Sequence, residues 1–453
     1  MDVAKQYRST FKKTEMQLKT ILNYVTDYKS FVFVKIRMER KTPDCMEYDT
    51  PEGECVVVEI RPRKNSKAIC SECGRPCPTY DTARIPRGWE FVALWTIPVY
   101  FVYKMRRVTC PEHGAIVEQV PWGDGKHTQT IEQRQFLANW ARRLSWSEVA
   151  ECFHTTFGKV YRAVQWIVGW GLKHRDLEGV ESIGVDEVQI HKGQNYATLV
   201  YQIDKGNKRL IGVEKDRSEE SLERFFEKFD QEGLEGKEVK EKEKRSKKIK
   251  WVCSDMWKPY LNVIGKICTN ALNILDRFHV KGHLTKAVDE TRKEDVRKLK
   301  ENGREEILKK SKYIWLKNPE NLTDRQVEKL SVLLKLNLRV VRAYLMKEDF
   351  ERFWEYKSAY WAGRFLDEWC VRAMRSKIEP MKKFVQTIRD HRELLLNWFK
   401  SKGLSSGVVE GFNNKVKLTT RKGYGFRTFE ALETVLYHTL GKLPEPESTH
   451  RFW

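Results

Sequence analysis

The sequence contains no continuous apolar run of about 18 residues, the length that a membrane-spanning helix requires. Its first residues, MDVAKQYRSTFKKTEMQ, are polar and charged and lack the apolar core of a secretory signal. There is no internal repeat, and the only biased tract is the charged stretch at residues 231–250. We therefore expect a cytoplasmic protein without membrane contact. Its ten cysteines are then expected to be thiols or metal ligands rather than disulfides.

Positive charge is in excess. The chain has 84 Lys and Arg against 63 Asp and Glu, a net charge of +21. This balance favours a polyanionic partner, with nucleic acid first, although a soluble protein with a basic surface is the alternative. A length of 453 residues, with 40% apolar residues, predicts two to four structural units.

The hydrophobic period changes near residue 182 and predicts a mixed β-sheet. Three strand candidates follow in series, SIGVDEVQI, YATLVYQID and RLIGVEKD, and two more, WVCSDMW and ALNILDRFHV, alternate with helical runs. Strands in series favour an antiparallel meander, and strands alternating with helices favour parallel additions. This is the strand order of a ribonuclease-H-like core.

Two acids interrupt these apolar strands. Asp186 lies inside the first strand and Asp255 ends the fourth, where a carboxylate is costly unless a cation compensates it. Carboxylates suit Mg²⁺, and paired ions activate a water or a 3′-hydroxyl for phosphodiester chemistry. The alternative is that both are turn residues at strand ends. Asp276 is a rival that could flank the site, Glu187 is expected on the opposite sheet face, and His279 is either an orienting or a structural residue.

A third acid stands in the stretch SSGVVEGFNNKVKLTTRKGYGF. On a helix, Glu410, Asn413, Asn414 and Lys417 are spaced i, i+3, i+4 and i+7, so they share one polar face. That face is either a solvated surface or the lining of a site that needs a carboxylate beside a polyanion.

Four stretches occur in the order IGVDEVQIHKG, VCSDMWKPY, LDRFHV and VVEGFNNKVKLTTRKGYGF. Across residues 65–440 their order and spacing resemble the ISL-three family of bacterial insertion-sequence transposases. The resemblance implies a DDE enzyme in which Asp186, Asp255 and Glu410 bind Mg²⁺ or Mn²⁺. Such an enzyme cleaves transposon ends and transfers the freed 3′-hydroxyl to target DNA. Its expected partners are double-stranded terminal inverted repeats, target DNA and further copies of itself, in the bacterial nucleoid.

Two other functions remain open on the same residues: a structure-specific nuclease that cuts but never joins, and a transposase-derived DNA-binding protein without catalysis. In every case basic and amide side chains near Glu410 are candidates for phosphate contact, although a solvated helix end is the alternative. They are Asn413, Asn414, Lys415, Lys417, Arg421, Lys422 and Arg427. The glycines of KGYGF permit close backbone approach, and its aromatics suit base stacking.

The cysteines form two short pairs, Cys70-x-x-Cys73 and Cys110-x-x-His113, each followed by glycine. Thiolate and imidazole ligands on two turns suit a structural, tetrahedral Zn²⁺. Cys77 could replace one ligand, and reduced cysteines without metal are the alternative. The resemblance supports zinc, with a role in folding and in binding DNA ends.

The stretch LSWSEVAECFHTTFGKVYRAVQWIV reads as two helices with a short turn, either a DNA-binding helix-turn-helix or a plain helical hairpin. Its exposed face is predicted to carry Lys159, Tyr161 and Arg162. Among the aromatics of residues 300–400, which are mostly expected in a core, Trp361 is a candidate for stacking on a flipped base.

The sequence thus predicts a multidomain α/β protein: a β-rich zinc-binding N-terminal part, a helix-turn-helix, and a ribonuclease-H-like mixed-sheet core interrupted by an all-helical insertion. The expected segments are an N-terminal β-containing segment (1–69), a zinc-binding domain (70–125), a helix-turn-helix domain (126–178), the first core part (179–285), the helical insertion (286–402) and the second core part with C-terminal helices (403–453).

Overall fold

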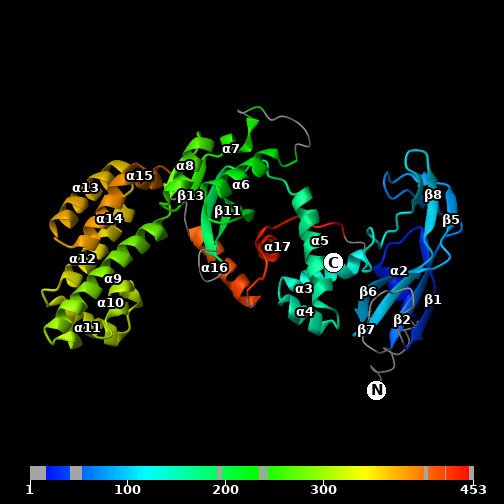
Figure 1. The fold of residues 1–453 in the computed structure, drawn as a ribbon, viewed down its shortest axis with the longest axis horizontal. Helices are drawn as coiled ribbons and strands as arrows, with labels where there is room; N and C mark the ends of the chain where they lie inside the picture. The colour runs from blue at the N-terminus through cyan, green and yellow to red at the C-terminus, as the bar shows by residue number, and fades with distance from the viewer. Residues whose placement is uncertain are drawn as a thin grey trace, which may run out of the picture. The chain divides into compact units, whose positions relative to one another are not determined.

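A computed structural model describes residues 17–40, 54–190, 196–233, 240, 243–401, 407–423 and 425–447. The first sixteen residues, which lack the apolar core of a signal, lie outside this range, as does part of the charged stretch at residues 231–250, whose composition predicts a solvated helix end or loop. The chain forms two compact units, which we name unit 1 (Met1–Arg175 with Lys422–Trp453) and unit 2 (Asp176–Arg421). Both α-helices and β-sheets are present, as predicted (Figure 1). None of the described helices combines the length and apolar character needed to cross a bilayer.

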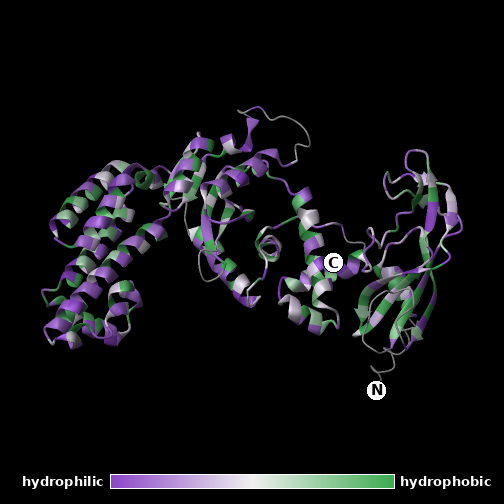
Figure 2. Cartoon of the chain, in the orientation of Figure 1, coloured by the Kyte–Doolittle hydropathy of each residue, from purple (hydrophilic) through white to green (hydrophobic). Residues whose placement is uncertain are grey.

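A four-stranded sheet begins unit 1, with strand order β1-β2-β7-β6. Its strands are β1 (Phe31–Glu39), β2 (Cys55–Pro62), β6 (Arg87–Leu94) and β7 (Ile97–Tyr103), with α2 (Leu18–Val25) packed on β1. Hydrophobic residues are concentrated on these strands (Figure 2). The buried ring of Trp122 makes edge contacts with Phe31, Trp89 and Tyr103, so aromatic packing forms the core of this sheet.

A smaller β lobe is joined to this sheet. It contains β3 (Ala68–Ile69), β4 (Pro76–Cys77), β5 (Thr79–Thr82), β8 (Arg106–Cys110) and β9 (Gly114–Val117), with sheet orders β3-β4 and β5-β8-β9. Glu118 lies buried at the junction. Its carboxylate accepts hydrogen bonds from the Tyr103 hydroxyl at 2.6 Å and from the Arg106 guanidinium at 2.6 and 2.9 Å. The lobe and the sheet are therefore linked by one buried charged network.

We expect Glu118→Gln to lower the free energy of unfolding by about 3–5 kcal/mol, because it leaves the guanidinium of Arg106 buried without its anion. The control is Asp81→Asn in the same lobe. Asp81 pairs with Arg107 at the surface, where both side chains are about half exposed, so its loss should cost less than about 1 kcal/mol. Urea denaturation measures both, and equal effects would contradict a structural role for the buried network.

Helices complete unit 1. They are α3 (Ile131–Ala141), α4 (Trp146–Cys152), α5 (Phe157–His174) and α17 (Phe429–Leu440). Ser145 and Glu148 form a capping box at the start of α4, and the Thr156 hydroxyl caps α5. The predicted two-helix segment is thus present. The last helix, α17, packs against α5 within unit 1, whereas the sequence grouped it with the core.

A five-stranded sheet lies at the centre of unit 2, in the order β12-β11-β10-β13-β14. Its strands are β10 (Ser182–Gln189), β11 (Tyr196–Asp204), β12 (Asn207–Lys215), β13 (Trp251–Ser254) and β14 (Leu272–Leu275). The first three are antiparallel neighbours, and β13 and β14 run parallel to β10. All five predicted strands are present, and the sheet is mixed as expected.

Helices pack on both faces of this sheet. One face buries Val185, Val252 and Phe226 beneath α6 (Glu219–Gln231) and α8 (Lys258–Ile267), with the short α7 (Arg245–Lys248) beside α6. On the other face the ring of Tyr201 stacks on Phe412 of α16 (Gly407–Lys422), with centroids 4.7 Å apart. The sheet therefore holds α16 directly against β10 and β11.

The remainder of unit 2 is a helical lobe, seen at the yellow-orange end of Figure 1. Its helices are α9 (Arg277–Glu301), α10 (Lys312–Leu316), α11 (Asp324–Leu334), α12 (Arg339–Glu351), α13 (Ala359–Arg375), α14 (Glu379–Asp390) and α15 (Arg392–Lys400). Phe353, Trp354 and Trp369 are buried in its core, as the aromatic stripe predicted. Trp361 differs, because it is 54% exposed.

Candidate active site and metal centre

The two acids predicted in strands reach the same edge of the sheet of unit 2. Gly184 in β10 is paired in parallel register with Cys253 in β13, so Asp186 and Asp255 each stand two residues beyond that pair. Both are buried, with 4% and 8% of their surface exposed. Parallel neighbouring strands therefore place two buried carboxylates side by side, and each must be compensated by nearby donors or cations.

Asp186 is compensated on the α16 face. The amide nitrogen of Asn413 donates a hydrogen bond to its Oδ2, and the Nε2 of His279 lies 3.7 Å from the same oxygen. Interaction with the Asp186 carboxylate raises the pKa of His279 to about 9, so its imidazole is a cation at neutral pH. Asp276 lies 3.9 Å from His279 and caps α9 by accepting the Phe278 amide.

Asp255 is compensated by Arg217, which sequence reasoning missed. The guanidinium of Arg217 lies 3.3 Å from Asp255 Oδ2 and 3.0 Å from Glu187 Oε1. Burial raises the pKa of Asp255, and burial together with the neighbouring charges of Asp255 and Asp186 raises the pKa of Glu187 to about 7. Glu187 follows Asp186 on the strand and was predicted to face away, yet Arg217 connects it to the acid pair.

Glu410 stands in the first turn of α16 and is exposed. The predicted polar face is divided: Asn413 contacts Asp186 and accepts a bond from Tyr201, whereas Asn414 and Lys417 are exposed. Among the described residues, the group of His, Cys, Asp and Glu side chains arranged to hold a metal ion is a cysteine-histidine cluster, not these acids. Glu410 thus lies one helical turn before Asn413, the residue of α16 that contacts Asp186, but it forms no metal-ligating group with Asp186 and Asp255 in the described part of the chain.

Docking of α16 depends on a glycine. A Cβ built at Gly184 would lie 2.6 Å from Cγ2 of Val409, so we expect Gly184→Ala to push α16 off the sheet and to cost about 1–3 kcal/mol. Hydrogen exchange should show faster exchange of the amides of α16. Gly411→Ala is the matched control in the same helix, because nothing lies within 4 Å of its Cβ and alanine favours helix. Equal protection in both variants would contradict this contact.

The predicted phosphate-binding side chains fall into two groups. Most are exposed, namely Arg162, Asn414, Lys415, Lys417, Arg421 and Arg427. Lys159 is not, because its amine pairs with Glu90 at 2.5 Å and its side chain is 12% exposed. Lys422 is half-buried and lies 3.4 Å from the carbonyl of Arg142. Phe426 of the KGYGF segment packs on Trp146, and Tyr424 is outside the described residues.

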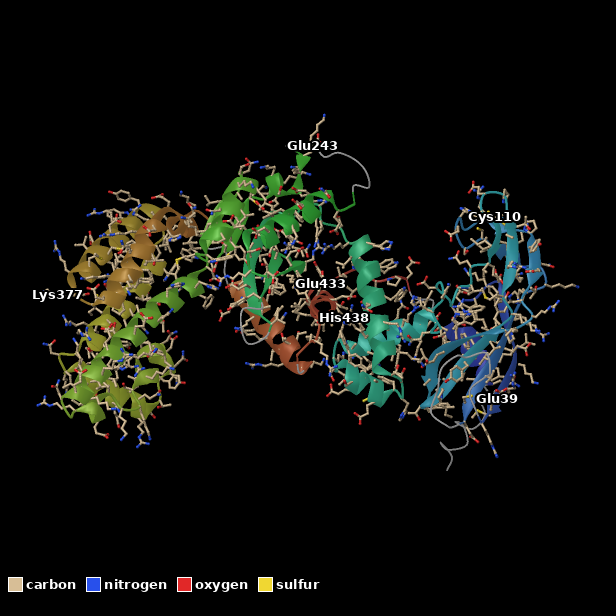
Figure 3. The ribbon with its side chains drawn as sticks, in the orientation of Figure 1. Glu39, Cys110, Glu243, Lys377, Glu433 and His438 are labelled. Carbon is tan, nitrogen blue, oxygen red and sulfur yellow. The ribbon has the colours of Figure 1, made fainter. Side chains whose placement is uncertain are left out.

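The cysteine pairs converge in the β lobe, where Figure 3 labels Cys110. One ligand atom from each of Cys70, Cys73, Cys110 and His113 lies within 4.8 Å of the others. Gly74 and Gly114 adopt φ of +68° and +67°, which lets the chain turn tightly after each pair. Hydrogen bonding from the His113 backbone lowers the pKa of Cys110 to about 6, which favours the thiolate that a metal needs. Cys77 is outside this cluster, and its thiol lies 3.4 Å from the carbonyl of Arg75.

Comparison of the sequence with known proteins identifies its family. A family model described as Transposase, for the ISL-three DDE family, matches residues 183–436, more than half of the chain. The transposase for insertion sequence element IS1557 of Mycobacterium tuberculosis is 28% identical over 427 residues, covering 87% of this chain and 90% of that protein. The transposase for IS1001 of Bordetella parapertussis is 24% identical over 388 residues, covering 85% and 91%. This chain belongs to the ISL-three family of insertion-sequence transposases.

Proposed function

We propose that this chain is an active DNA transposase that binds the terminal inverted repeats of an insertion sequence, cleaves the DNA at its ends and joins the freed 3′-hydroxyls to target DNA. The observation that carries the proposal is the pair of buried carboxylates, Asp186 and Asp255, at one edge of neighbouring parallel strands. The strand order of this sheet supports a ribonuclease-H-like core. Glu410, on the helix that contacts Asp186, is the third acid of the proposal.

The residues of this site fit a hard divalent ion such as Mg²⁺ or Mn²⁺. The donors are carboxylate oxygens, and Oε2 of Glu187 is buried with no hydrogen-bond partner among the described residues. When bound, such ions lower the pKa of the attacking water or hydroxyl and stabilise the leaving oxygen. The chain itself positions the acids: Asn413 and His279 orient Asp186, and the amide of Trp257 donates to Asp255 at 3.0 Å.

The exposed cations around α16 support DNA binding, because phosphate contacts supply most of the affinity for a duplex. We propose that α4 and α5 form the helix-turn-helix and that Arg162 contributes to it, with Lys159 instead stabilising the fold. The helical lobe is proposed as the insertion between the second and third acids. Two ends must be brought together for transposition, so a homodimer or larger assembly is part of the proposal.

The cysteine cluster is proposed to hold a structural Zn²⁺. Three thiolates and one imidazole are a common tetrahedral ligand set. Cys73 and His113 lie in turns of the small β lobe, Cys110 ends β8, and Cys70 forms a bridge with Glu118. The short strands of the lobe enclose few apolar residues, so a bound metal would add folding energy that this core lacks. The lobe would then present a rigid surface to the DNA ends.

The test is a reaction of the purified protein with Mg²⁺ and DNA that carries both ends of the flanking element. A transposase produces nicks with free 3′-hydroxyls at the ends and, from pre-cleaved ends, joined products in a target plasmid. Cleavage without joining would favour the structure-specific nuclease, and binding without cleavage would favour the non-catalytic protein.

A further inference from the structure

Arg217 is held in place from several sides. It follows Asp216, a non-glycine residue with φ of +72°, whose amide donates to Tyr196 and whose carbonyl accepts the hydroxyl of Thr198. This backbone geometry at the end of β12 directs Arg217 toward β10 and β13. The guanidinium also lies 4.4 Å from the ring centroid of Trp257, which adds a cation–π contact.

The guanidinium lies between two carboxylates. Its Nη1 reaches Glu187 at 3.0 Å and its Nη2 reaches Asp255 at 3.3 Å, and the three side chains are only 27%, 14% and 10% exposed. Without a cation between them, the two buried acids would repel each other. The guanidinium can leave the position between these carboxylates only if the side chain moves.

Asp255 is one of the acids that the proposed function assigns to a divalent ion, and Arg217 contacts its Oδ2. An oxygen bonded to a guanidinium offers less negative charge to a metal, and two cations a few ångströms apart repel each other. Metal binding at this oxygen and the Arg217 contact therefore oppose each other.

We propose that Arg217 is a resident counter-ion that occupies the cation position between Glu187 and Asp255 in the DNA-free protein, and that a divalent ion must displace it to bind. This inference rests on the proposed function of Asp255. The displaced guanidinium is then available for a DNA phosphate, because its planar fork can donate two parallel hydrogen bonds to the non-bridging oxygens. Metal binding is thereby weakened until DNA is present.

The experiment is isothermal titration calorimetry of Mn²⁺ into the full-length, DNA-free protein with its zinc site loaded. The relevant site is the one lost in Asp255→Asn. Arg217→Met keeps an apolar side chain against Trp257 but removes the positive charge. The affinity for Mn²⁺ should then rise about tenfold, the change in affinity that the loss of one charged hydrogen bond produces. Arg217→Lys keeps the charge but cannot span both acids, and an intermediate tightening is expected.

The matched control is Arg224→Ala. Arg224 lies 3.5 Å from Glu214 and pairs with it rather than with Glu187 or Asp255, and its loss changes the net charge by the same amount. Circular dichroism checks that each variant is folded. If Arg217→Met does not fold, Arg217→Lys is used for the test instead. Unchanged or weaker Mn²⁺ binding in the Arg217 variants, with the Asp255-dependent site present, would overturn the inference and leave the proposed function intact. If no variant shows an Asp255-dependent site with or without DNA, the metal assignment itself is wrong.

Discussion

Asp186→Asn is expected to abolish DNA cleavage by this transposase while sparing its binding to DNA ends. Asparagine is nearly the same size and still meets Asn413, but it removes the negative charge from a buried position on β10. Bound metal contributes several kcal/mol to phosphodiester chemistry, so loss of this ligand should lower the rate about 10³-fold or more. Cleavage of end-containing DNA in Mg²⁺ measures the rate, and gel retardation in EDTA measures binding.

The matched control is Asp204→Asn, the same chemical change at the opposite end of the sheet. Asp204 ends β11 and accepts hydrogen bonds from Gln202 and from the amide of Glu181, far from the edge that carries the acid pair. Its cleavage rate should remain close to that of the unmodified chain. Persistent cleavage by Asp186→Asn would refute the assignment of the acid.

The second large effect concerns the β lobe. Cys110→Ser should reduce bound zinc from about one ion per chain to nearly none, because serine is a poor zinc ligand and three ligands hold the ion weakly. Structural zinc contributes directly to folding free energy. The lobe should then become sensitive to protease between residues 68 and 117. Metal release into a colorimetric chelator, with limited proteolysis, measures both effects.

The zinc content of Cys77→Ser tests whether Cys77 is one of the zinc ligands. Cys77 is buried beside the cluster, but its thiol is directed to the carbonyl of Arg75, so this variant should retain its zinc. If instead Cys77→Ser loses the ion and Cys70→Ser keeps it, the ligand set is different. An unmodified chain purified without any zinc would favour the alternative of reduced, metal-free cysteines.

The strands and the paired cysteines could be predicted because their signals in the sequence are local. Alternating or continuous apolar runs predicted β10–β14, and the two Cys/His pairs with trailing glycines predicted the cluster, which the structure contains. The spacing of Glu410 predicted a helix but not which face of it would be buried. In the structure Val409, Phe412 and Val416 form the buried stripe, and Asn413 alone of the four polar residues contacts Asp186.

Contacts between segments that are distant in the chain could not be predicted from the sequence. Arg217 follows a strand in the unremarkable stretch EKDRSEE, and no periodicity indicates that it reaches Glu187 and Asp255. Lys159 was expected on an exposed face, but α3 packs on both β6 and α5, and Lys159 of α5 pairs with the buried Glu90 of β6. Both cases depend on where one element comes to lie on another.

The sequence alone determined the positive charge, the order of the strands and the two short Cys/His pairs, because each is recorded in composition, local periodicity or spacing. The family followed from the resemblance of its motifs to those of known transposases. Only the tertiary structure decided which charges are compensated inside the fold and by which partners. The physical reason is that the cost of a buried charge depends on the distance to its counter-charge, and that distance is fixed by the register of β10 on β13 and by the packing of helices on the sheet.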